Sequence, residues 1–213
     1  MKKTIVSGAV VAAMMMSMGG AMAAAMSSEL SVKGHLAIPS CQVSLAKNGV
    51  FDLGKISNAV IETSKSTPMK EIAAAINVEC EADTFLNFSA IDNRAGTAST
   101  VESTHFGLGN VNGTGKLGYY KMRLIAATVD RVGVSVYSAS KGSTSLSSSM
   151  EVLVDKDKVT GWANSENAQA SGKNFQAFLM VEPVLASSKE MGGPITDSTK
   201  LDGSATLNFS YAL

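Results

Sequence analysis

The sequence predicts an all-β protein with the two-layer architecture of a β-sandwich. Period-two alternation of apolar and polar residues recurs along the chain, and clusters of Gly, Ser, Asn and Asp separate the alternating runs. Helix signals are few by comparison. Roughly eight short strands joined by turns are typical of a sandwich.

The N-terminus predicts export. Lys2 and Lys3 precede an uncharged apolar run over residues 5–18, and the small-residue site Ala21-Met22-Ala23 follows. This pattern indicates a secretory signal peptide over residues 1–23, with cleavage after Ala23 or after Ala25. A retained membrane anchor is the alternative, although the apolar run is short for a span of roughly 20 residues.

Charge and length limit the function classes. The chain has 213 residues with 18 basic and 18 acidic side chains, and removal of Lys2 and Lys3 leaves 16 basic against 18 acidic. A nearly neutral chain without a basic cluster argues against nucleic acid as a partner. The remaining length of about 190 residues suits a single domain.

The two cysteines predict a disulfide. Cys41 and Cys80 both follow the export signal, and thiols of exported proteins are normally oxidised. Closing a loop of about 40 residues stabilises a domain by about 3 to 4 kcal/mol in the chain-entropy model. Two buried free thiols are the alternative.

The first alternating run follows the signal peptide and predicts an amphipathic strand. Its even positions are apolar or small and its odd positions are polar. The even positions are Ala24, Met26, Ser28, Leu30, Val32, Gly34, Leu36 and Ile38. Such a strand lays one face on apolar surface and exposes the other.

Further strands follow along the chain, with loops expected over residues 92–116, 138–149 and 187–203. The expected strands are Val50–Ile56, Ile72–Cys80, Phe85–Ile91, Leu117–Val129, Val132–Tyr137, Met150–Val154, Phe175–Ala186 and Ala205–Leu213. Residues 70–75 contain three alanines and could begin a helix. We expect a strand there because Ile76, Val78 and Cys80 continue a period of two. In the last strand the apolar residues occupy the odd positions up to Leu213.

Several segments resemble one family when they are taken together in order. They are VKGHL at 32–36, CQV at 41–43, FDLGKI at 51–56, INVEC at 76–80, FQA at 175–177 and GSATLNFSY at 203–211. Their order and the cysteine spacing are similar to those of the major subunits of chaperone-usher fimbriae, the pilins of type 1 fimbriae among them. A poorly characterised, fimbria-like branch of exported proteins is included in this resemblance. It covers nearly the whole chain after the signal peptide.

The resemblance implies an incomplete, immunoglobulin-like sandwich over residues 35–213, with a groove left open by a missing strand. Residues 24–34 would be an N-terminal extension that donates a strand to a neighbouring subunit. The donor side chains by position are Met26, Ser28, Leu30 and Val32. The groove and chaperone-binding residues are Leu207, Phe209, Tyr211 and Leu213.

The partners implied by the resemblance are a periplasmic chaperone, an outer-membrane usher and neighbouring subunits of the same kind. The chain would pass through the periplasm and end in a cell-surface fimbria that supports adhesion. The alternative is a monomeric exported binding module whose site lies in loops 92–116 and 138–149. In that case a host glycan or another surface receptor would be the ligand.

Catalytic and metal-binding patterns are not found in the sequence. His35 and His105 have no neighbouring ligands at metal-site spacing, and no nucleophile elbow or complete phosphate-binding loop occurs. We therefore expect a non-enzymatic protein without a cofactor. Trp162 and Tyr119-Tyr120 could stack on a sugar, but packing in the core is the commoner role of such aromatics.

Overall fold

The computed structural model describes residues 30–34, 38–143, 145–165 and 168–212. By its internal contacts the chain divides into two units, residues 1–37 and 38–213. The predicted signal peptide, Met26, Ser28 and Leu213 lie outside the described residues. Of the first unit only 30–34 are described, and these residues form no strand. The strand expected there is therefore wrong for its described part, where no ladder of backbone hydrogen bonds forms. Leu30 and Val32 are 89% and 90% exposed.

The second unit is almost entirely β-structure. Its strands are β1 (Cys41–Leu45), β2 (Thr67–Pro68), β3 (Ile72–Asp92), β4 (Phe106–Gly107), β5 (Asn110–Val111), β6 (Gly115–Lys116), β7 (Gly118–Val129), β8 (Val132–Gly133), β9 (Ser135–Ser140), β10 (Ser148–Ser149), β11 (Glu151–Leu153), β12 (Lys158–Ser165), β13 (Ala168–Gln169), β14 (Ser171–Leu185) and β15 (Ala205–Tyr211). Two short 3-10 turns occur at η1 (Ala46–Gly49) and η2 (Asn58–Val60). The all-β prediction is confirmed.

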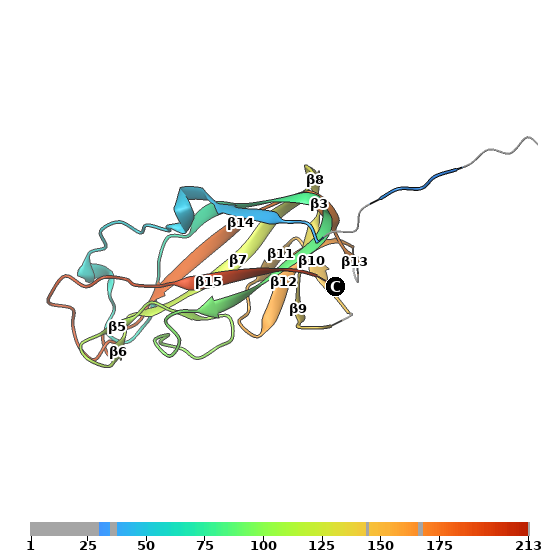
Figure 1. Ribbon diagram of the computed structural model, residues 1–213. Helices are drawn as coiled ribbons and strands as arrows, with labels where there is room; N and C mark the ends of the chain where they lie inside the picture. The colour runs from blue at the N-terminus through green and yellow to red at the C-terminus, as the bar shows by residue number, and fades with distance from the viewer. Residues whose placement is uncertain (1–29, 35–37, 144, 166–167, 213) are drawn as a thin grey trace, which may run out of the picture. The chain divides into compact units, whose positions relative to one another are not determined.

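The strands form two layers that share β3 (Figure 1). The first half of β3 pairs with β1 and β14, and β14 pairs in turn with β7. The second half of β3 pairs with β12 and β15, and β12 pairs with β9. All of these pairs are antiparallel. A strand long enough to cross from one sheet to the other is one way in which sandwiches make a corner.

The core lies between the layers. Along β3 the side chains of Ile76 and Val78 are buried while Glu79 is exposed, as the alternation predicts. Trp162 of β12 is fully buried, with its ring centroid 5.3 Å from that of Phe175 and 6.5 Å from that of Phe88. Its indole N–H donates a hydrogen bond of 3.0 Å to the carbonyl of Gln176 in the other layer. This buried indole therefore connects the two sheets.

Most expected strands are present, although some boundaries differ. Ile72–Cys80 and Phe85–Ile91 are parts of the single strand β3, and residues 72–75 are strand rather than helix. Val132–Tyr137 divides into β8 and the start of β9. The expected strand Val50–Ile56 is wrong, since these residues pair with no other strand of the described chain. Strands β1 and β12 were not among the expected ones, and neither were the two-residue strands β2, β4, β5, β6, β10 and β13.

The predicted disulfide is confirmed. Cys41 and Cys80 are directly opposite in the β1–β3 ladder, with their Cα atoms 4.1 Å apart. They are the only two cysteines of the chain. The bond fastens β1, which pairs with β3 alone among the described strands, to the strand shared by both layers.

Replacing both cysteines by alanine should lower the free energy of unfolding by about 2 to 4 kcal/mol, because the unfolded chain loses its cross-link. Urea unfolding of the variant and of the oxidised wild type measures this. Reducing the wild type before unfolding should have the same effect and is the internal control. Equal midpoints for oxidised and reduced protein would contradict the prediction.

Candidate functional site

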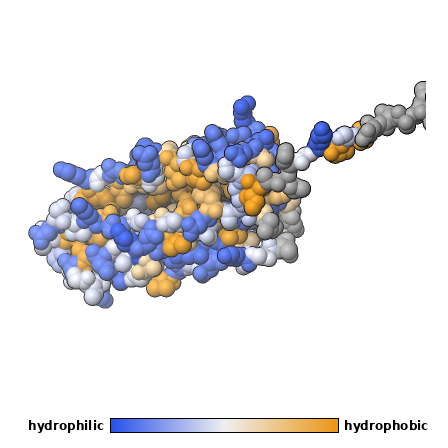
Figure 2. Space-filling view, viewed as in Figure 1, coloured by the Kyte–Doolittle hydropathy of each residue, from blue (hydrophilic) through white to orange (hydrophobic). Residues whose placement is uncertain are grey.

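A long groove opens between the edges of the two layers. It has a volume of about 1120 Å³ and is floored by inward-facing side chains such as Met122 of β7 and Leu179 of β14. Leu45 and Phe51 line one side of it, and Leu207 lines the other. In Figure 1 the floor strands are visible between the blue strand β1 and the dark red strand β15. Figure 2 shows apolar surface in a hollow on the same face, between more polar rims.

Strand β15 forms one edge of the groove, and its free backbone groups face outward from β3. The amide of Asn93 donates to the carbonyl of Ser204 at 3.0 Å, and that of Ala212 donates to Phe85 at 2.9 Å. In an antiparallel ladder, bonded residues alternate with residues whose N–H and C=O groups point to the opposite edge. The even positions therefore bond to β3. The odd positions of β15 present their backbone groups at an edge that no described strand covers.

The odd positions of β15 also carry the apolar side chains that face the core. Ala205, Leu207 and Phe209 are half-buried and pack against the core, and the ring centroid of Phe209 lies 5.2 Å from that of Phe88. Tyr211 is 39% exposed, and its hydroxyl donates to the carbonyl of Pro39. The alternation predicted for the last strand is thus present, and it joins an apolar inner face to an unpaired backbone edge.

Strand β1 lies along the other side of the groove with the same arrangement. The amide of Glu81 donates to the carbonyl of Ser40 at 3.0 Å, so the even positions of β1 bond to β3. The backbone groups of Cys41, Val43 and Leu45 then point away from β3. Val43 is 42% exposed, whereas Cys41 and Leu45 pack against the core.

The segment 50–56 continues this side of the groove without pairing. Phe51, Leu53 and Ile56 are half-buried and line the groove, whereas the polar residues between them are exposed. Gly54 has a φ of +66°, and its amide donates a hydrogen bond of 2.8 Å to the side chain of Asp52. The period-two pattern, from which a strand was predicted, corresponds to apolar contact on one face. It did not indicate a strand within the described chain, because a backbone partner is missing.

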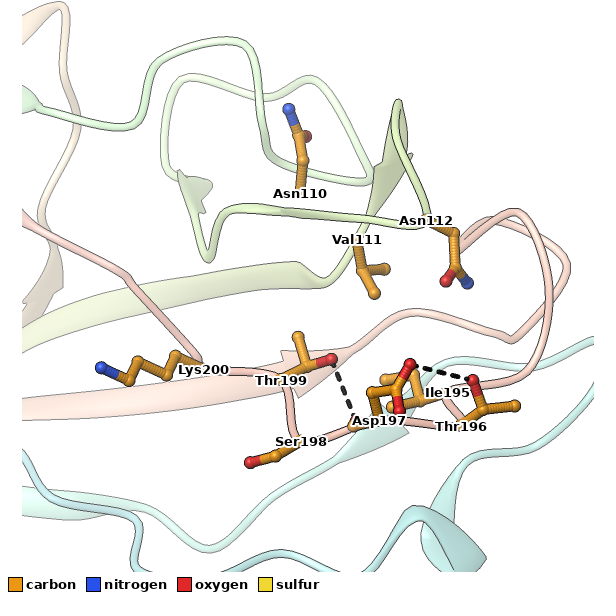
Figure 3. A pocket seen from close by; sticks show the side chains of 9 residues that line it. All are labelled: Asn110, Val111, Asn112, Ile195, Thr196, Asp197, Ser198, Thr199 and Lys200. Atoms are coloured by element: carbon orange, nitrogen blue, oxygen red, sulfur yellow. Dashed lines mark hydrogen bonds between the residues drawn. The ribbon is translucent and has the colours of Figure 1, made fainter.

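A smaller pocket adjoins one end of the groove (Figure 3). Its volume is about 400 Å³, and residues 195–200 line both it and the groove. The hydroxyl of Thr199 donates to the carbonyl of Asp197 at 3.4 Å, and that of Thr196 donates to the Asp197 side chain at 3.5 Å. These polar groups thus bond among themselves within the segment that separates the two spaces.

Of the aromatic residues considered for sugar stacking, Tyr120 lines the groove, whereas Trp162 and Tyr119 are not among its lining residues. Trp162 is fully buried and Tyr120 is 6% exposed, so neither presents a face to solvent. Burial raises the pKa of Tyr120, with a smaller contribution in the same direction from Asp92. Tyr119 stacks on His105 with ring centroids 3.8 Å apart, and burial lowers the pKa of that histidine.

Two other kinds of site are absent from the described part of the chain. Within those residues, no group of three or more His, Cys, Asp or Glu side chains could hold a metal ion. The same residues contain no helix that is long and apolar enough to cross a bilayer.

Comparison with known proteins gives a match without an assigned role. A family model described as "Protein of unknown function (DUF1120)" matches residues 30–134. The matched region includes the disulfide and the strands β1, β3 and β7, and it ends before β14 and β15. No curated protein matches the chain. The chain is thus similar to an uncharacterised family over the part that forms one wall and part of the floor of the groove.

Hydrogen exchange should reveal the free edge of β15 directly. We expect the amides of Leu207 and Phe209 to exchange at least tenfold faster than those of Thr206 and Asn208, whose backbone groups face β3. Residue-resolved exchange measured by NMR at neutral pH checks this alternation. Strand β14, which is hydrogen-bonded to β3 on one side and to β7 on the other, is the protected reference. Uniform protection along β15 would mean that something already covers the edge.

Proposed function

We propose that this protein is a structural subunit of a bacterial surface fimbria, assembled by donation of a strand from one subunit to the next. The observation that carries the proposal is the groove, whose floor is apolar and whose two sides present unpaired backbone groups. An added strand could satisfy those groups with hydrogen bonds while alternate side chains fill the apolar floor. An open sheet edge over apolar surface otherwise promotes aggregation.

The proposed donor is the N-terminal extension, residues 24–34, of another copy. Leu30 and Val32 are almost fully exposed, and they alternate with the polar residues Ser31 and Lys33. Burying a leucine or valine side chain contributes roughly 1.5 to 3 kcal/mol, which favours transfer of these side chains into a groove. Met26 and Ser28 would extend the same apolar face by sequence.

The remaining partners follow from the hazard of the open groove. A subunit in transit needs a temporary strand, so we include a periplasmic chaperone that lends one and an outer-membrane usher at which the donor replaces it. Export by residues 1–23 and a final place in a cell-surface fimbria belong to the same proposal. The segment 50–56 supports it, because it lines the groove with half-buried apolar side chains and its backbone pairs with no described strand, so it could serve as a second partner of the incoming strand.

Two substitutions in the extension test strand donation. Leu30→Asp should abolish formation of multimers, because a carboxylate would have to be buried in the apolar groove. Ser31→Asp is the matched control on the polar face of the same strand and should assemble as the wild type does. Assembly with a co-expressed chaperone and usher can be followed by electron microscopy and by the size of the purified species.

Deleting residues 24–32 should also prevent assembly while leaving a soluble complex with the chaperone, because the groove remains intact. A deletion variant that still forms fibres would rule out donation by this segment. A wild-type protein that purifies as a stable monomer without any partner strand would instead favour the monomeric exported binding module.

A further inference from the structure

Among the described strands, β15 has β3 as its single neighbour, and this makes its register a weak point. A slip by one residue would turn Leu207 and Phe209 outward and is opposed by the loss of their apolar contacts. A slip by two residues keeps the apolar face inward, so the alternating pattern alone does not oppose it. Specific side-chain contacts are needed to oppose such a slip, and the outer face of the strand makes two sets of them.

Asn87 of β3 makes one such contact. Its side-chain oxygen accepts a hydrogen bond of 2.7 Å from the hydroxyl of Ser210, the residue directly opposite in the ladder. Asn87 is only 9% exposed, and across Gly161 it faces Tyr137 of β9, whose pKa the asparagine side chain lowers against the larger, opposite effect of burial. Buried amides need such partners, so the asparagine has little freedom to accept a shifted strand.

Strand β12 lies between β9 and β3, and it has a glycine at the position that separates Tyr137 from Asn87. Tyr137 is opposite Gly161 of β12, and a Cβ atom at that position would come within 2.7 Å of the tyrosine ring. The ring therefore lies over the glycine. Tyr137 is 1% exposed and packs with Ala139, Leu146 and Ala163 in a small apolar cluster on the outer face. Tyr137, which faces Asn87, is therefore itself held in place by its packing.

Asn93 makes the second contact at the other end of β15. Its side-chain nitrogen lies 3.0 Å from the hydroxyl of Ser204 and 3.1 Å from that of Thr206. The hydroxyl of Thr206 also lies 3.2 Å from the side-chain oxygen of Asn93. The backbone amide of the same asparagine bonds to the carbonyl of Ser204. Both ends of the strand are thus joined, by side chains as well as by backbone, to β3 or to Asn93, the residue that directly follows β3.

We propose that Asn87 and Asn93 are positioning residues that fix the register of β15, and thereby set the free edge at which a further strand is added. The second half of this inference rests on the proposed function, whereas the first half does not. A register shifted by two residues would move Ser210 away from Asn87 and place a different set of side chains along the groove.

The test compares Asn87→Ala, Asn93→Ala and the double variant with Asn77→Ala. Asn77 is on the same strand, and its side chain makes no hydrogen bond among the described residues. Exchange of the amides of Thr206, Asn208 and Ser210 should be at least tenfold faster in the double variant than in the wild type. It should change less than twofold in Asn77→Ala. Ser210→Ala should reproduce the effect of Asn87→Ala at the C-terminal end of β15, and Ser210→Thr, which keeps the hydroxyl, should restore slow exchange.

A second readout uses a synthetic peptide with the sequence of residues 24–33. Its dissociation constant for the purified protein should rise at least fivefold in the double variant and stay unchanged in Asn77→Ala.

Unchanged exchange in β15 of the double variant would overturn the register role. Equal acceleration throughout β3 and β14 would overturn it as well, since the asparagines would then support the whole fold. Faster exchange with unchanged peptide binding would overturn the link to strand addition. A peptide that fails to bind even the wild type would count against the proposed function, and the exchange data would still decide the register.

Discussion

The rest of the structure depends on the hydrogen-bonding of one strand, β3. Its 21 residues pair with β1 and β14 at one end and with β12 and β15 at the other, so both layers are organised around a single piece of chain. The disulfide, the half-buried strand β15 and both asparagine contacts are all attached to it. Among the described strands, β1 and β15 have no other backbone neighbour, whereas β14 and β12 have further partners. The fold thus has a central strand, β3, that is paired on both sides, and two edge strands, β1 and β15, that are paired on one side in the described chain.

The two edge strands explain why the groove exists. A sandwich normally buries the inner face of each sheet against the other, up to the last strand of each. Here β1 and β15 are the last strands of their sheets on this side, and the apolar floor between them is left uncovered. Leu45, Phe51 and Leu207 line an open space instead of meeting one another. The hydrophobic effect and the unpaired backbone groups therefore favour the same outcome, which is the addition of one more extended segment.

The sequence predicted strands and the orientation of their side chains correctly wherever one face of a strand is buried and the other faces solvent. Ile76, Val78 and the odd positions of β15 showed this alternation, and their orientation was predicted correctly. Strand β12 was missed because both of its faces are covered. Trp162 points into the main core, and Ala163 belongs to the outer apolar cluster, so no alternation remains. Strand β1 was missed because the apolar positions change from even to odd near Pro39.

The groove itself could not be derived from alternation. Periodicity tells which side chains share a face, but the pairing of an edge depends on residues far away in the sequence. Phe51 and Leu53 illustrate this, since their pattern is that of a strand and their backbone has no partner in the described chain. The role of Asn87 on the outer face of β3 was equally hidden, because a polar residue in a strand usually indicates exposure. Asn87 is instead buried between Tyr137 and Ser210.

The position of the disulfide has a mechanical consequence. A pulling force applied to the N-terminal segment enters the second unit near residue 38 and reaches Cys41 three residues later. Without a cross-link, such a force would break the hydrogen bonds of the β1–β3 ladder one after another. The covalent bond to Cys80 passes the load directly to the middle of β3, where backbone pairs on both sides share it in shear. A domain built in this way resists tension at the point where it is first applied.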